Sequence, residues 1–453
     1  MRHKFPSCFN VTLPLLKMVF LLAGVTLSTL CSADSKDFED MNAHYQVTFN
    51  WQRHPAFQSP YSAVNSLTAG EDKMYTFSFT PHLGIRPWQG GELYFDPEIN
   101  SGVPFTQSLI GSGGFTNGEI TRAGGDTPTL YRQRLFLRQT WNHGGGSEKV
   151  ESGLNQLAGA VEKNRFVLTA GNFSTLDVFD GNTYAKDPRT QFMNWGNWTY
   201  AAYDYAADAR GFGWGAAWEW YRDEWVFRLA RMTGPKNPNE LEVDFALLTH
   251  YGDQLEVEHA HTFAGQPGKI RVLGWRNRAK LATFSDALDY LKAHPGADPQ
   301  TIFAARTTEQ IKSGIGFNVE QAINENAGLF LRVMQADGRT ETHAFTEVDG
   351  SFSAGVAIKG VAWGRAEDTI GLSLMSNTLS DDRRRFLEAG GISYFIGDGK
   401  LNYRPENIFE GYYSLNVYKE TWLTADYQRI ENPAYNADRG PVNVFAFRFH
   451  SEF

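Results

Sequence analysis

The last twelve residues of the chain, Val442 to Phe453, constrain the fold more than any other stretch. Side chains alternate strictly along it, which is the period of a β-strand. One face carries Phe445, Phe447, Phe449, Ser451 and Phe453, and the other carries Val444, Ala446, Arg448, His450 and Glu452. A strand with an aromatic face, a charged opposite face and a terminal Phe is typical of the closing strand of an outer-membrane barrel. The pattern therefore predicts an all-β, transmembrane antiparallel β-barrel.

The N-terminus has the features of an export signal. Basic residues at Arg2, Lys4 and Lys17 precede an apolar run from 18 to 30, and small residues follow at 31–33. We predict a signal peptide at 1–33 and a single barrel domain at 34–453. After Ala33 no apolar run approaches the ~18 residues of a membrane-spanning helix, so the mature chain can cross a bilayer only as a barrel.

Charge and cysteine content exclude some classes of protein. Both cysteines, Cys8 and Cys31, lie in the predicted leader, so the mature domain has no disulfide. Without the three leader cations, 39 basic residues face 51 acidic ones, a net charge of −12. This balance is unfavourable for binding nucleic acid.

Alternating stretches recur along the mature chain. The clearest are 45–52, 75–80, 212–220 and 241–247. Together with weaker candidates and the terminal stretch they number about seventeen, and because a bacterial barrel has an even number of strands we predict sixteen, with eighteen as the alternative.

The connections between the alternating stretches differ strongly in length. Three are long, at 96–130, 172–210 and 279–312. We expect long extracellular loops of this kind to fold into the lumen. In the third, Phe284, Leu288 and Leu291 at helical spacing, together with Ser285, predict a short capped helix.

Three arginines lie in the stretch 131–140. Arg132, Arg134 and Arg138 share one face by alternation, ~6.6–13 Å apart along a strand. They cannot face hydrocarbon, where each would cost a few kcal/mol, so we expect them to face a wet lumen. They could donate hydrogen bonds to permeating hydroxyls or anions, or they could bind carboxylates of an inserted loop. The sequence leaves both open.

Other inward positions carry both charge signs. By alternation Glu219, Arg228, Arg332 and Arg448 face the lumen. Mixed signs favour a neutral, hydroxyl-rich solute over a single class of ion. Aromatic residues of the long connections, Trp195 among them, could stack on sugar rings or pack within the loops.

No catalytic or cofactor motif is present. The chain has no HExxH, GxSxG, phosphate-binding loop or dinucleotide fingerprint. His259 and His261 lie two residues apart, but no third ligand has useful spacing, and we expect them in an aromatic belt or the lumen and no metal or cofactor.

Several stretches resemble the OprB family of carbohydrate-selective porins. They are NPAYNADRGPV at 432–442, DVFDGNTYAKDPRTQFM at 177–193, YDYAADARG at 203–211 and GGISYFIGDGKLNY at 390–403. The resemblance implies a sixteen-stranded barrel in the Gram-negative outer membrane that passes sugars by diffusion. It also implies that Asp187 and Arg189, like the basic strand, lie where the family keeps charge.

The function expected from the sequence is therefore passive, carbohydrate-selective diffusion of sugars into the periplasm. An anion-selective or acidic-sugar-selective porin is one alternative, and a β-rich outer-membrane enzyme is another. We expect contacts with outer-membrane lipid and, through Phe453, with the barrel-assembly machinery. The barrel could work as a monomer or a homotrimer.

Overall fold

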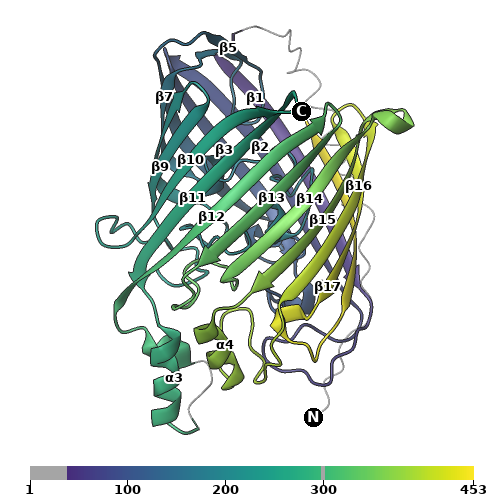
Figure 1. Cartoon of the computed structure of the whole chain (residues 1–453). Coiled ribbons are helices and arrows are strands. Elements are labelled where there is room, and N and C mark those ends of the chain that lie inside the picture. The colour runs from purple at the N-terminus through teal and green to yellow at the C-terminus, as the bar shows by residue number, and fades with distance from the viewer. Residues whose placement is uncertain (1–37, 297–300) are drawn as a thin grey trace.

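Sixteen antiparallel strands form a closed barrel in a computed structural model, which describes residues 38–296 and 301–453 (Figure 1). The predicted signal peptide at 1–33 lies outside the described residues. The barrel strands are β1 (Met41–His54), β2 (Asp72–Trp88), β3 (Gly91–Val103), β4 (Thr129–Asn142), β7 (Arg165–Phe173), β8 (Gly213–Arg222), β9 (Trp225–Met232), β10 (Tyr251–Phe263), β11 (Gln266–Lys280), β12 (Glu309–Asn324), β13 (Ala327–Ala336), β14 (Gly350–Gly360), β15 (Arg365–Thr378), β16 (Glu406–Tyr418), β17 (Thr421–Glu431) and β18 (Val442–Glu452). A separate hairpin consists of β5 (Ser147–Val150) and β6 (Gly159–Glu162).

The terminal strand closes the barrel against the first strand. β18 pairs with β1 from Gln46↔Glu452 to Arg53↔Phe445. Two backbone hydrogen bonds extend the pairing, from Tyr45 N to Phe453 O at 2.8 Å and from Phe453 N to Tyr45 O at 2.9 Å. Closure leaves no unpaired edge strand, which a barrel in lipid requires.

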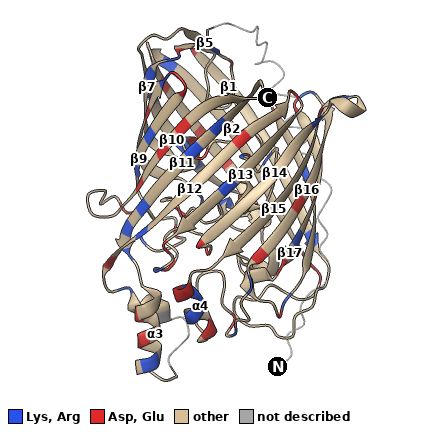
Figure 2. Cartoon of the chain, in the orientation of Figure 1, with Lys and Arg blue, Asp and Glu red and all other residues tan. Residues whose placement is uncertain are grey.

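Alternation separates the two faces of the wall as the sequence predicts. On β18 the Phe445 side is exposed outside, whereas Arg448 and His450 are buried inside. Both charge signs occur side by side along the strands (Figure 2). The predicted fold class and strand number are confirmed.

The predicted strand at 241–247 is wrong. Residues 233–250 connect β9 and β10 and project from the side of the barrel (Figure 1). Their one strand-like contact is an isolated bridge between Pro235 and Val243. The ring of Phe245 lies 6.4 Å from that of Trp214, so the alternating apolar residues follow the wall without joining its ladder.

The two ends of the barrel differ in their connections. At one end most connections have two residues, as at 223–224, although 143–164 holds the β5–β6 hairpin. At the other end the connections are longer, at 55–71, 104–128, 174–212, 233–250, 281–308, 337–349, 379–405 and 432–441. By the usual asymmetry of such barrels the long connections are extracellular.

Helices occur only in the connections of the described part. They are α2 (Trp195–Trp198), α3 (Phe284–Ala293) and α4 (Asp381–Glu388). Short 3₁₀ segments are η1 (Phe105–Gln107), η2 (Gly118–Arg122), η3 (Thr175–Asp177), η4 (Thr301–Ala305), η5 (Val361–Trp363) and η6 (Pro433–Tyr435). In the described part, none of the helices has the length and apolar character needed to span a bilayer.

The helix predicted in the third long connection is α3, with one correction. Its N-cap is Thr283, whose hydroxyl accepts the Asp286 N–H at 3.1 Å, and Ser285 lies inside the helix. α3 packs on α4 through the rings of Phe284 and Phe386, 5.5 Å apart, beyond the end of the barrel (Figure 1).

Two long connections fill much of the lumen. Residues from 104–128 and 174–212 form an aromatic core with the connections 337–349 and 379–405. The connections contribute Phe115, Trp195, Trp198, Tyr200, Tyr203, Tyr205, Phe345 and Phe395 to this core, and the wall contributes Tyr94 and Trp275. The barrel is therefore solvent-filled only where this core leaves room.

Candidate functional site

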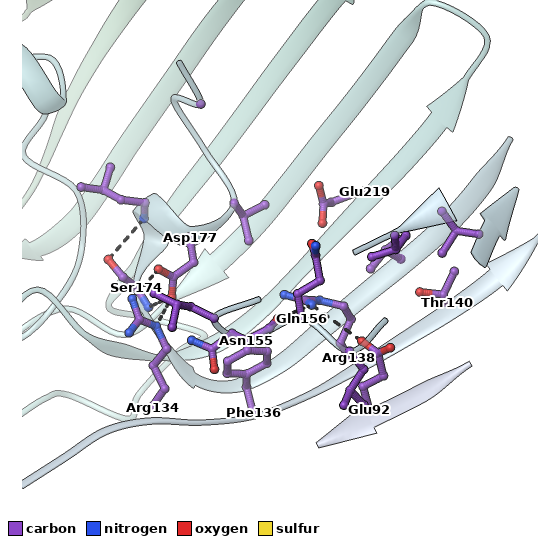
Figure 3. Close-up of a pocket in the computed structure, with 18 of the residues that line it drawn as sticks. Glu92, Arg134, Phe136, Arg138, Thr140, Asn155, Gln156, Ser174, Asp177 and Glu219 are labelled. Carbon is purple, nitrogen blue, oxygen red and sulfur yellow. Dashed lines mark hydrogen bonds and ion pairs between the residues drawn. The ribbon is translucent and has the colours of Figure 1, made fainter. Parts of the chain in front are cut away.

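A cavity of about 1800 Å³ occupies the lumen between the inserted core and the end with the short connections. At the end with the short connections, the cavity is lined by residues of the two-residue β2–β3 turn and of the β5–β6 hairpin. The segment 174–189 lines its inner end, and charged side chains of β3, β4 and β8–β12 line its walls (Figure 3).

Arg134 on β4 binds the inserted segment. Its guanidinium donates to both carboxylate oxygens of Asp177, at 2.8 and 2.7 Å, and contacts Asp96 at 3.3 Å (Figure 3). Asp177 also accepts the Ser174 N–H at 2.9 Å, which completes the cap of η3. Burial opposes ionisation of Asp177, but Arg134 outweighs burial and lowers the pKa of that carboxyl. Arg134 therefore has the geometry of a clamp on the loop.

Arg138, four residues further along β4, has fewer contacts with carboxylates than Arg134. Its Nη1 donates to the Asn155 carbonyl at 3.0 Å, and the nearest carboxylate oxygen, on Glu92, is 3.8 Å away. The guanidinium lies over the rings of Tyr94 and Phe136, at 5.2 and 5.4 Å. With 29% of its side chain exposed, Arg138 keeps donors that face the cavity (Figure 3).

Arg132 does not share the face of these two arginines, which corrects the expected ladder of three. β3 pairs Asp96 with Arg134 and the next residue, Pro97, with Arg132, so Gln133 is an extra residue in β4. Such a bulge reverses the alternation. Gln133 points inward and donates to Glu98 at 2.6 Å, whereas Arg132 lies over Trp214 at 4.8 Å and lines a different cavity.

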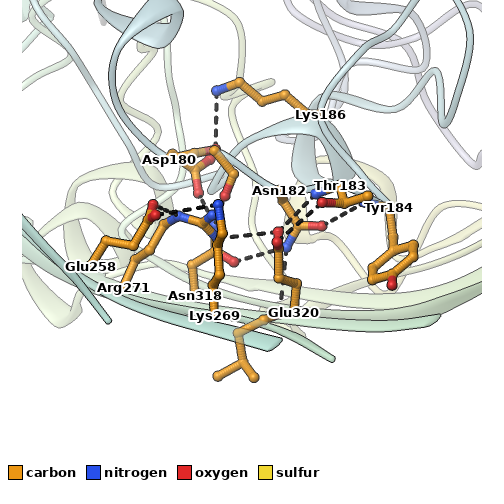
Figure 4. Close-up of polar contacts among 12 residues, drawn as sticks. Asp180, Asn182, Thr183, Tyr184, Lys186, Glu258, Lys269, Arg271, Asn318 and Glu320 are labelled. Atoms are coloured by element: carbon orange, nitrogen blue, oxygen red, sulfur yellow. Dashed lines mark hydrogen bonds and ion pairs between the residues drawn. The ribbon is translucent and has the colours of Figure 1, made fainter. Parts of the chain in front are cut away.

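The wall from β8 to β12 carries a chain of alternating charges. Arg228 contacts Glu219, Glu256 and Glu258 at 3.1, 2.8 and 3.0 Å. Arg271 continues the chain from Glu258 at 2.7 Å to Glu320 at 3.2 Å (Figure 4). Mixed charge along this wall agrees with the alternation expected for Glu219 and Arg228.

This charged wall also holds the inserted segment. Glu256 accepts the Asp180 N–H and Glu320 accepts the Thr183 N–H, each at 2.8 Å. The segment 180–184 is therefore fixed by backbone amides to the carboxylates of β10 and β12 (Figure 4). It cannot move without breaking charge-assisted hydrogen bonds.

Arg189 and Asp187 lie together at the inner end of the cavity. Arg189 contacts Glu98 at 2.7 Å and Glu119 at 2.8 Å, and its side chain is 4% exposed. Asp187 accepts the Arg189 N–H at 2.8 Å and the Thr190 hydroxyl at 2.9 Å. Arg189 thus joins the wall, the connection 104–128 and the connection 174–212.

Arg332 and Arg448 face the lumen but meet the inserted core instead of the cavity. Arg332 donates to Asp180 Oδ1 at 2.9 Å and to the Asn197 carbonyl at 2.7 Å. Arg448 donates to the carbonyls of Pro188 and Gln191 at 2.9 and 2.8 Å. Alternation predicts that such side chains point into the lumen, but it does not predict which residues of the inserted loops they contact there.

Trp195 lies inside the aromatic core. Its ring is 4.8 Å from that of Trp198 and 5.2 Å from that of Phe345, and its Nε1 donates to the Ala201 carbonyl at 3.2 Å. Only 2% of Trp195 is exposed, so the structure does not present it for stacking on a sugar.

Lys186 also lines the cavity, and no pattern of residues around it predicts this role. Its ammonium donates to the carbonyls of Phe179 and Asp180, at 2.9 and 3.0 Å. Burial lowers the pKa of Lys186 to about 8, despite the nearby Asp180. Its charge therefore changes close to neutral pH.

In the described residues, no group of three or more His, Cys, Asp or Glu side chains has an arrangement that could hold a metal ion. The His259 ring lies 4.3 Å from the ring of Trp225 and 6.3 Å from that of His261. The histidine pair is part of an aromatic cluster on β9 and β10.

Comparison with known families identifies the chain. The sequence profile described as carbohydrate-selective porin, OprB family, matches residues 69–453. The chain belongs to the OprB family. Porins are channels and not enzymes, so the alternative of a β-rich enzyme is excluded, and the family implies an outer-membrane location.

Solved structures of similar fold include other outer-membrane channels. Pseudomonas putida OprB at high pH matches this OprB-family chain with a TM-score of 0.65 and 15% identity, over 91% of this chain and 94% of that chain. The Acinetobacter baumannii channel DcaP matches with a TM-score of 0.51 and 8% identity, over 92% and 99%. At these identities the likeness concerns the fold. No curated protein matches the sequence.

Proposed function

We propose that this OprB-family porin conducts small neutral sugars by passive diffusion, with the cavity beside β4 as the solute path. The observation that carries the proposal is that a donor and an acceptor on nearby strands of the wall line the same cavity. Arg138 offers guanidinium N–H groups from β4, and Glu219 offers carboxylate oxygens from β8 into the same cavity (Figure 3). A sugar hydroxyl both donates and accepts hydrogen bonds. As the sugar moves along the cavity, its hydroxyl groups can therefore replace hydrogen bonds to water by hydrogen bonds to these side chains.

Charge balance favours a neutral solute over an anion. The cavity is lined by ten Lys and Arg side chains and by eight Asp and Glu side chains, so neither sign of charge dominates. A path for anions alone would offer one sign of charge. One observation supports the anion-selective alternative: among the described residues, no carboxylate oxygen is closer than 3.8 Å to Arg138.

Sugar block of single channels tests the proposal and the role of Arg138 together. In planar bilayers, added glucose should reduce the ion current through the native protein. Arg138→Gln should weaken this block by about tenfold, the effect of losing one charge-assisted hydrogen bond. Arg222→Gln, at an exposed turn, is the matched control and should block normally.

Three results would contradict parts of this proposal. Channels that conduct without any sugar block would exclude the sugar path. Strong anion preference in reversal potentials, again without block, would favour the anion-selective alternative. An unchanged block in Arg138→Gln would exclude Arg138 as a contact for the solute.

Ion selectivity should depend on pH through Lys186. Because its pKa is about 8, raising the pH from 7 to 9 removes one positive charge from the cavity. The reversal potential in a KCl gradient should therefore shift toward cation preference over this range. Lys186→Met should show the cation-shifted value already at pH 7 and lose the step, and a step that persists in the variant would assign the titration to another group.

A further inference from the structure

The barrel wall has a notch at its extracellular end. The ladder between β4 and β7 stops at Leu135↔Asn172, whereas the ladder between β3 and β4 continues to Asn100↔Thr129. Residues 129–134 of β4 thus extend past the end of their neighbour. A second cavity, of about 770 Å³, lies at this point. Its lining comes from the ends of β4, β7 and β8 and from the connections 174–212 and 233–250.

Two arginines in this second cavity lack acidic partners. Within the described residues, no carboxylate lies within ion-pair distance of Arg132 or Arg210, whereas Arg134, Arg138, Arg228 and Arg271 of the first cavity all have one. Arg132 donates through Nε to Asn172 at 3.1 Å and lies over Trp214. Arg210 donates through Nε to the Arg122 carbonyl at 3.3 Å and lies 4.2 Å over the ring of Tyr131.

Both guanidinium groups are oriented but not neutralised. The aromatic ring fixes the plane of each group, and Nε is the one nitrogen for which the described residues supply a hydrogen-bond acceptor. The Nη pair of each arginine therefore stays available, and a planar fork of this kind fits phosphate or carboxylate with two parallel hydrogen bonds. Both arginines line the same cavity, Arg132 from the outward face of β4 and Arg210 over the inward-facing ring of Tyr131, and a phosphate has enough oxygens to accept from both forks.

The acidic residues of the lining are already engaged. Asp208 accepts the N–H groups of Arg210 and Phe212 at 2.9 and 3.0 Å. Asp244 contacts His250, and Glu242 contacts Lys236. None of these carboxylates therefore serves the guanidinium forks of Arg132 and Arg210.

The cavity borders the apolar outer surface of the barrel. Trp214 lies on the outward face of β8, which continues to the exposed Trp218 and Trp220. On the covering connection Phe245 and Leu248 are exposed by 64% and 88%. A ligand held here could place an anionic head in the cavity and an apolar part against the belt. The aromatic rings of Trp214, Tyr131 and Phe245 suit the faces of a saccharide.

We propose that this cavity is a second binding site, separate from the solute path, for a phosphorylated saccharide. Arg132 and Arg210 bind the phosphate, and the rings of Trp214 and Phe245 contact the sugar. Such a group reaches the notch either as the headgroup of a glycolipid in the outer leaflet or as a free sugar phosphate. The volume of the cavity is in the range of sites for small ligands.

Binding to the purified, detergent-solubilised full-length barrel tests the site. Native mass spectrometry would measure the binding of diphosphoryl lipid A in mixed micelles and, separately, of glucosamine phosphate. Arg132→Gln combined with Arg210→Gln should weaken binding of the recognised probe by about tenfold or more. Arg404→Gln is the matched control, because Arg404 also has no ion pair in the described part but is exposed on the distant connection 379–405.

Each outcome has a defined meaning. Loss of lipid A binding alone assigns the site to a membrane glycolipid, and loss of glucosamine phosphate binding alone assigns it to a soluble sugar phosphate. Equal binding by the native protein and the double variant, or no binding of either probe, would overturn the proposal. Sugar block in bilayers should be unchanged in the double variant, which confirms its folding and separates this site from the solute path. If the double variant fails to insert, Arg132→Gln alone, at an exposed side chain, provides the same comparison.

Discussion

Replacing Arg189 by methionine is expected to detach the inserted connections from the barrel wall and to destabilise the protein by about 3–5 kcal/mol. Arg189 neutralises Glu98 and Glu119, which are both almost fully buried. Without it, and within the described residues, Glu98 stays buried with no ion pair and Glu119 keeps only Arg122, at 2.8 Å, and breaking a buried pair from one side has this cost. The urea midpoint for loss of the folded barrel should fall, and single-channel conductance should rise because the connection 174–212 no longer fills the lumen.

Compensating substitutions distinguish a charge effect from a packing effect. In Arg189→Met, adding Glu98→Gln and Glu119→Gln should restore most of the lost stability, because the buried carboxylates are then neutral. Arg222→Met removes an arginine from an exposed pair and should leave both the midpoint and the conductance unchanged. A native-like midpoint in Arg189→Met would show that the connection is held by its aromatic core alone.

The wall of the barrel could be predicted from the sequence because its signal is local. Alternation on β18 gives the outward Phe445 side and the inward Arg448 side without knowledge of any partner strand. The error at 241–247 has the same origin. Leu241, Val243 and Phe245 alternate in the sequence, but only Phe245 has a ring contact with the wall, and alternation does not reveal whether backbone pairing accompanies it.

The site could be predicted less well because its geometry depends on contacts distant in sequence. One extra residue, Gln133, turns Arg132 away from Arg134, and nothing in YRQRLFLR marks the bulge. Likewise Arg332 and Arg448 point inward as alternation requires, but a loop from residues 180–197 occupies the space before them. The strand determines which way a side chain points, whereas the inserted loop determines whether that side chain can reach a solute.

The inserted connections share one means of attachment to the wall and to one another. Buried carboxylates accept backbone N–H groups of irregular segments, as Glu406 does from Gly113 and Gly114 and Glu410 does from Met193. Irregular backbone in a lumen cannot bond to itself as a helix or a strand does, so its N–H groups need outside acceptors. A carboxylate has two oxygens and can satisfy several N–H groups at once. This arrangement explains how long loops are held inside the barrel without secondary structure.

Asp204 is the strongest example, and its replacement by alanine is expected to cost about 3–5 kcal/mol. Its carboxylate accepts the N–H groups of His343, Ala344 and Phe345 at 2.7, 2.9 and 3.1 Å, and the Lys312 ammonium at 2.7 Å. Burial opposes ionisation, but Lys312 and His343 together outweigh burial and lower the pKa of Asp204 to about 2. Because this pKa is below the unfolded value of ~3.9, the stabilisation is complete above that value and is lost only as the pH falls toward 2. The effect of Asp204→Ala should therefore be full at neutral pH.

Hydrogen exchange locates this effect. In Asp204→Ala the amides of 343–345 should lose protection, because their acceptor is gone, while amides of β1 and β18 keep theirs. Adding Lys312→Met to Asp204→Ala should recover part of the urea midpoint, since it removes the buried ammonium left without a partner. Lys269→Met is the matched control, because Lys269 contacts Glu258 at 3.4 Å from a half-exposed position. If Asp204→Ala retains protection at 343–345, the connection 337–349 is held by the ring of Phe345 against Trp195 and Tyr205 and not by the carboxylate.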